Sequence, residues 1–132
     1  YGPRGFQQYQ CVIPEINAKE GIHQILDVVS RSGRGSFLAV IKRFGSIPSP
    51  GLLSFPIEGI TLSLDFPNTD KLSSNLFKNI DSILKSFGGR IYPAKDAHMS
   101  SNDFKSSYPL WSELEKLRDP ALMSHFWSRV TK

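Results

Sequence analysis

Residues 60–66, ITLSLDF, alternate strictly between apolar and polar side chains. The apolar set points to one side and Thr61, Ser63 and Asp65 point to the other, which predicts a β-strand with one buried face. Aspartate is disfavoured inside a strand, so Asp65 indicates a polar surface with a specific purpose. This strand sets the register for the rest of the chain.

Further strands and two helices are predicted on either side of this segment. β-forming side chains are typical of strands at residues 6–13, 36–44 and 90–92. Helical periodicity predicts one helix within residues 15–32, whose buried stripe is Ile16, Ile22, Ile25, Leu26 and Val29. A second helix is predicted within residues 70–87, with Thr69 as its N-cap. Its buried stripe is Leu72, Leu76, Ile80, Ile83, Leu84 and Phe87.

The resulting order, β-α-β-β-α-β, predicts an α+β, ferredoxin-like fold. Its antiparallel sheet has the strand order 4-1-3-2, and both helices cover one face. Residues 1–97 are predicted to form this domain, and residues 98–132 a C-terminal helical tail that packs on it. A connection of about fifteen residues, rich in Pro and Gly, joins the second and third strands and is longer than most loops.

The composition limits the classes of protein. The 132 residues are 39% hydrophobic and 11% aromatic, which excludes a disordered chain, and the single Cys11 excludes a disulfide-stapled one. The net charge of +4 is modest and scattered. With no apolar run of about 20 residues, we expect a cytoplasmic or membrane-peripheral location. The chain starts at Tyr1 and is soon strand-like, so we expect it to be part of a larger protein.

The sheet face opposite the helices is predicted to be polar. Periodicity places Gln8 and Gln10 there with the polar residues of the third strand. On the second strand, periodicity leaves open whether Lys42 and Phe44, or Ile41 and Arg43, share this face. The candidate site residues on this face and at its end are Gln8, Gln10, Lys42, Phe44, Thr61, Ser63, Asp65, Tyr92 and Lys95.

Several chemistries lack their signatures in this sequence. No two histidines have the spacing of metal ligands, and there is neither a glycine-rich phosphate loop nor a nucleophile–base arrangement. RNA-recognition motifs share the predicted element order. They stack bases on aromatic residues of the third strand, where this chain has no aromatic residue on the open face and has Asp65, which repels phosphate. We therefore expect no nucleic-acid partner and no metal.

Five separated segments carry a resemblance to a known family. The sequence resembles the C-terminal substrate, or cap, domain of the vanillyl-alcohol-oxidase type of FAD-dependent oxidoreductases, in the branch of the decaprenylphosphoryl-β-D-ribose 2-oxidases and aldonolactone oxidases. The segments are YGPRGFQQYQCVIP (1–14), SFLAVIKRFG (36–45), LSFPIEGITLSLDFP (53–67), FGGRIYPAKD (87–96) and DPALMSHFWSRV (119–130).

The resemblance implies an oxidoreductase whose FAD is held mainly by an N-terminal domain outside this chain. The reaction would be oxidation of a hydroxyl on a sugar, alditol, aldonolactone or polyprenyl-phosphate sugar, by hydride transfer to the flavin. Lys95 would stabilise negative charge at the pyrimidine edge of the flavin, and Tyr92 would lie near the ring and the substrate. The positions that match the substrate pocket or its surroundings are Gln10, Lys42, Phe44, Thr61, Ser63 and Asp65.

The resemblance is incomplete at two positions. The family has a different polar residue at the position of Thr61 and a cysteine at that of Ser63, so the substrate stays open. Alone, the 132 residues are expected to be inactive. The alternative hypothesis is a stand-alone ferredoxin-like module that binds a small ligand or a protein and has a regulatory role.

Overall fold

A four-stranded antiparallel sheet is built around the segment with the strictest alternation. The computed structural model describes residues 3–68, 70–96 and 98–132. The strands are β1 (Phe6–Pro14), β2 (Ala39–Phe44), β3 (Gly59–Pro67) and β4 (Arg90–Ile91). Their order in space is β2-β3-β1-β4, with every neighbouring pair antiparallel. The α+β fold and the strand order 4-1-3-2 are thus confirmed.

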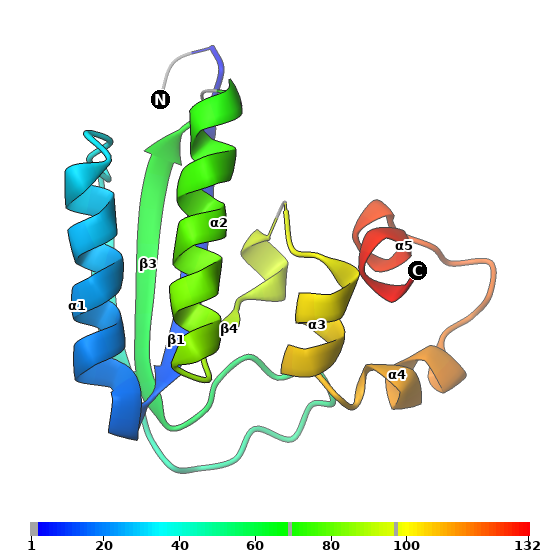
Figure 1. Cartoon of the computed structure of the whole chain (residues 1–132). Helices are drawn as coiled ribbons and strands as arrows, with labels where there is room; N and C mark the ends of the chain where they lie inside the picture. Colours follow the sequence, from blue (N-terminus) through cyan, green and yellow to red (C-terminus); the bar gives the residue numbers. More distant parts are fainter. Residues whose placement is uncertain (1–2, 69, 97) are drawn as a thin grey trace. The chain divides into compact units, whose positions relative to one another are not determined.

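Two long helices, α1 (Glu15–Arg31) and α2 (Asp70–Ser86), lie on the same face of this sheet (Figure 1). They cover the apolar side chains of the two central strands, among which Cys11, Ile13, Leu62 and Leu64 are buried. Burial of such side chains contributes about 1.5–3 kcal/mol each. The apolar side chains of each central strand therefore pack against the helices, and the polar side chains that alternate with them lie on the opposite face of the sheet.

The buried side of α1 differs from the predicted stripe at two residues. Ile22, Ile25 and Val29 are buried as expected, but Ile16 is 91% exposed and Leu26 is 36% exposed, so the assignment of these two to the core is wrong. At 3.6 residues per turn, Ile16 lies about a third of a turn away from Ile22 around the helix. The stripe is continued instead by small residues, since Ala18 and Gly21 are buried there.

The buried side of α2 is confirmed at the positions that the structure describes. Leu76, Ile80 and Leu84 are buried, and Ile83 and Phe87 are half-buried. Phe77 is also buried, which the sequence analysis missed. Its ring lies 5.4 Å from that of Tyr9 and 5.5 Å from that of Phe66, measured between centroids. The predicted N-cap Thr69 and the side chain of Leu72 lie outside the described residues.

The chain divides into two compact units. One comprises Tyr1–Pro48 and Phe55–Asp96, which carry the sheet, the two long helices and a short 3₁₀ helix, η1 (Pro93–Lys95). The other comprises Ser49–Ser54 and Ala97–Lys132. The prediction that the helical tail packs on the first domain stays a prediction.

The second unit contains three short helices around one aromatic side chain. They are α3 (Ser101–Ser107), α4 (Trp111–Leu117) and α5 (His125–Thr131), which confirms the helical tail. Phe104 is fully buried, and the rings of Tyr108, Phe126 and Trp127 lie 5.4–5.8 Å from it. Ser100 caps α3, because its Oγ accepts a hydrogen bond from the backbone N–H of Asp103. Among the described residues, no helix is long and apolar enough to cross a membrane.

Candidate functional site

The sheet face opposite α1 and α2, which we call the polar face, is defined by strand register. Gln8 pairs with Asp65 and Gln10 with Ser63 across β1 and β3, and Lys42 pairs with Thr61 across β2 and β3. Paired residues in adjacent strands point to the same side of a sheet. The register therefore places Lys42 and Phe44 on the polar face, and Ile41 and Arg43 on the helix face, which periodicity alone left undecided.

A chain of hydrogen bonds crosses the centre of the polar face. The Thr61 hydroxyl donates to the backbone oxygen of Cys11 at 2.8 Å, and its oxygen accepts from Gln10 Nε2 at 3.2 Å. Thr61 is only 2% exposed and Gln10 is half-buried. Buried polar groups are stable when paired in this way, so the orientation of both side chains is fixed by the sheet itself.

Asp65 has structural partners that explain its place in a central strand. It is 4% exposed, and its Oδ1 accepts a hydrogen bond of 2.6 Å from Gln8 Nε2. Its backbone N–H donates to Ser36 Oγ and to the carbonyl oxygen of Leu38. A buried carboxylate requires such pairing, and this one holds a neighbouring amide on the polar face.

Aromatic rings cover the other end of the polar face. Phe55, from the connection between β2 and β3, stacks on Tyr92 with ring centroids 4.6 Å apart and makes an edge contact with Phe44 at 5.9 Å. Phe44 is on one edge strand and Tyr92 follows the other, so the Phe55 ring lies between the two edges of the sheet. The predicted pocket residues Phe44 and Tyr92 thus contact the Phe55 ring from the two sides of the polar face.

Arg90 fastens the segment that carries Phe55. Its Nε donates to the carbonyl oxygen of Phe55 at 3.0 Å, and its Nη2 donates to that of Pro56 at 3.2 Å. The sequence analysis missed the roles of Phe55 and Arg90. The only available signal was an aromatic residue inside a long loop rich in Pro and Gly, and such a signal does not say which surface the ring covers.

Two exposed lysines flank the polar face. Lys42 lies on the edge strand β2, whereas Lys95 ends η1, directly after Tyr92, whose backbone N–H donates to the Gln10 carbonyl at 2.8 Å. Neither ammonium group has an ion-pair partner in the described part of the chain. The structure therefore places Lys95 at the margin of the polar face and joins the other eight predicted residues on it: Gln8, Gln10, Lys42, Phe44, Thr61, Ser63, Asp65 and Tyr92.

Two titratable groups on the helix face of the sheet, Cys11 and Tyr9, are part of the hydrophobic core. Burial raises the pKa of the Cys11 thiol to about 12, so the thiol stays protonated at neutral pH. Burial also raises the pKa of Tyr9 well above its usual value, and its hydroxyl donates to Asp81 Oδ1 at 2.8 Å. Within residues 3–68, 70–96 and 98–132, no three potential ligands are grouped to hold a metal ion.

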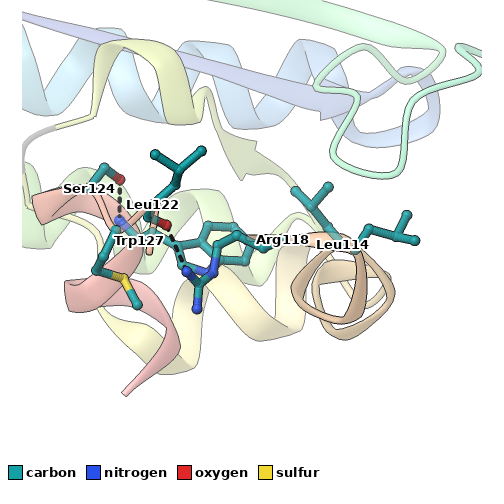
Figure 2. A pocket seen from close by; sticks show the side chains of 7 residues that line it. Leu114, Arg118, Leu122, Ser124 and Trp127 are labelled. Carbon is teal, nitrogen blue, oxygen red and sulfur yellow. Dashed lines mark hydrogen bonds between the residues drawn. The ribbon is translucent and has the colours of Figure 1, made fainter. Parts of the chain in front are cut away.

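A separate apolar hollow in the second unit is organised by Arg118 (Figure 2). Its Nη1 donates to the carbonyl oxygen of Leu122 at 2.7 Å, while Nε and Nη2 donate to the Glu115 carboxylate, which also accepts from Trp127 Nε1. Hydrogen bonds from Arg118 and Trp127 lower the pKa of Glu115 to about 2. The guanidinium is thus engaged in holding the connection between α4 and α5 in place.

Comparison with known proteins finds relatives over most of this chain. No family model matches the sequence. The chain is 38% identical, over 123 residues and 91% of its length, to the decaprenylphosphoryl-β-D-ribose oxidase of Mycolicibacterium smegmatis, of which it covers 26%. It is 29% identical, over 86% of its length, to an uncharacterized protein in the mprA 5′ region of Streptomyces coelicolor, of which it covers 30%. The chain thus spans less than a third of either relative and is similar to part of an oxidase.

Proposed function

We propose that this chain is the substrate-facing part of an FAD-dependent oxidoreductase that oxidises a hydroxyl group of a sugar or sugar derivative. The observation that carries the proposal is the similarity to a decaprenylphosphoryl-β-D-ribose oxidase over 91% of the chain. The polar face adds independent chemical support, because amide, hydroxyl and ammonium groups arranged on a rigid sheet suit a ligand with many hydroxyls.

The residues at one margin of the polar face fit a flavin. Lys95 is an exposed cation, and Tyr92 is a half-buried aromatic ring held by stacking on Phe55. FAD, when bound, supplies the acceptor for the hydride that leaves the substrate carbon. In this proposal Lys95 provides positive charge where negative charge develops, and Tyr92 orients the substrate beside the ring.

The substrate would lie over the rest of the polar face. Gln10 and Ser63 face it from the two central strands, and Lys42 offers a cation at the β2 edge, suited to a phosphate or another anionic group. Thr61 and Asp65 are buried and act through their neighbours. A polyprenyl-phosphate sugar, an alditol and an aldonolactone are all substrates of this chemical class.

The remaining FAD contacts are proposed to come from another domain of the same protein. The chain covers 26% of the oxidase that it resembles, so most of a comparable protein has no counterpart in these 132 residues. The proposed site is therefore shared, and the 132-residue chain alone is expected to have no turnover.

The test uses the longest polypeptide that contains this chain. We expect it to purify with a visible flavin spectrum that is bleached anaerobically by a riboside, alditol or aldonolactone. Lys95→Ala is expected to slow flavin reduction by at least about tenfold, because a preorganised charge is lost. Lys78→Ala, which removes an exposed lysine from α2, is the matched control. A protein without flavin contradicts the proposal, and an unchanged reduction rate in Lys95→Ala contradicts the role of Lys95.

A further inference from the structure

Two glutamines, Gln8 and Gln10, lie two residues apart on the polar face, and both amides are anchored toward β3. Gln8 Nε2 donates to Asp65 and Gln10 Nε2 donates to Thr61. Residues i and i+2 of a strand are about 7 Å apart on the same face. The two amides therefore form a row along β1.

The orientation of the Gln10 amide follows from donor and acceptor chemistry. A backbone carbonyl only accepts, so the 2.8 Å contact between Thr61 Oγ1 and the Cys11 oxygen uses the single hydroxyl hydrogen of Thr61. Thr61 Oγ1 is then only an acceptor toward other groups. Its contact with Gln10 must come from the amide NH₂, which leaves the amide oxygen on the branch that points away from Thr61.

The same reasoning applies to the second amide of the row. A carboxylate oxygen accepts, so the 2.6 Å contact with Asp65 takes the NH₂ of Gln8 and directs its carbonyl oxygen away from β3. Each amide thus uses one of its two N–H groups inside the sheet, and its carbonyl oxygen has no partner among the described residues. A free glutamine could turn its amide over, whereas these hydrogen bonds fix which branch of each amide carries the oxygen.

We propose that Gln8 and Gln10 are paired acceptors for ligand hydroxyls, and that Thr61 is the positioning residue that fixes the acceptor end of Gln10. This inference rests on the proposed function and adds to it the recognition chemistry of the same face. The two carbonyl oxygens accept hydrogen bonds only from donors, so a ligand hydroxyl is preferred to hydrogen at the carbon that they contact.

The test compares ligand discrimination in Thr61→Val, which keeps the shape but removes the hydroxyl, and in the conservative Thr61→Ser. The probes are methyl β-D-ribofuranoside and its 2-deoxy and 3-deoxy counterparts, titrated into the longest polypeptide that contains the chain. We expect the wild type to bind one of the two deoxy probes about tenfold more weakly than the parent riboside, which corresponds to the loss of one hydrogen bond. Thr61→Ser should keep this ratio, and Thr61→Val should reduce it to about twofold.

A second variant keeps the inference testable if Thr61→Val does not fold. Gln10→Met keeps the length of a half-buried side chain, but its thioether is only a weak acceptor, so it should lose the same discrimination. If Thr61 had only a structural role, Thr61→Val would weaken the binding of all probes equally and would leave the ratio of their affinities unchanged. That result would overturn the inference. Absence of discrimination or of binding in the wild type overturns it too. Flavin content and flavin reduction are measured separately, so failure of the oxidase proposal is distinguished from failure of this inference.

Discussion

Replacement of Phe55 by Ala tests whether the connection between β2 and β3 packs on the sheet. Phe55 is 5% exposed, and truncation of a buried phenylalanine costs about 3–5 kcal/mol. Each of its ring contacts, with Tyr92 and Phe44, accounts for about 0.5–1.5 kcal/mol of this. Because a loop settles into a vacated space more easily than a helix does, we expect a loss of about 3 kcal/mol in the free energy of unfolding.

Urea denaturation of the 132-residue chain measures this loss. With a slope of about 2 kcal/mol per molar urea, the midpoint of Phe55→Ala should fall by about 1.5 M. Phe37→Ala is the matched control, since Phe37 is 69% exposed and its removal should change the free energy by about 0.5 kcal/mol or less. A loss below about 1 kcal/mol in Phe55→Ala would show that the ring does not cover the polar face.

Three further predictions concern other parts of the chain. Because the folded-state pKa of Glu115 is lowered to about 2, its stabilising effect is complete above the ordinary carboxyl pKa and is lost as the pH falls from about 4.5 toward 2. A titration followed by Trp127 fluorescence should show this transition, and Glu115→Gln should remove it. Gly59→Ala should lower the melting temperature strongly, because Gly59 has a φ of 159° and a Cβ there would lie 2.1 Å from a backbone oxygen of β1. Gly35→Ala is the control and should leave the melting temperature unchanged, since no atom lies within 4 Å of a Cβ at that position. The Cys11 thiol, buried and with its pKa raised to about 12, should react with a disulfide reagent at pH 8 only after denaturant is added.

The fold was predictable because local patterns and topology agree. The alternation of residues 60–66 and the helical periods on either side of it lead to the observed strand order. Two details were not predictable, for physical reasons. A period of two leaves open which side of β2 faces the helices, and only its pairing with Thr61 decides this for Lys42. Ile16 is apolar but out of phase with the buried stripe, and small residues take its place.

The site was predictable as a set of positions but not as a set of contacts. The open-face residues of β1 and β3 follow from alternation, and the register confirms that they lie together. The partners of Thr61 and Asp65, and the position of Phe55, depend on residues 27 to 57 positions away or on loop packing. Local sequence patterns carry no information at that range. The catalytic and binding roles stay predictions.

The interleaving of core and site along β1 and β3 has a consequence for how this protein can be re-engineered. The even-numbered positions 8 and 10 and the odd-numbered positions 61, 63 and 65 lie on the polar face, while the positions between them belong to the core. A combinatorial library restricted to positions 8, 10 and 63 would therefore vary the surface while leaving the helix-facing packing untouched. A one-residue deletion within either strand would exchange the two sets of side chains and turn the core outward. New specificities are thus reachable by substitution in these strands, whereas length changes belong in the connection between β2 and β3.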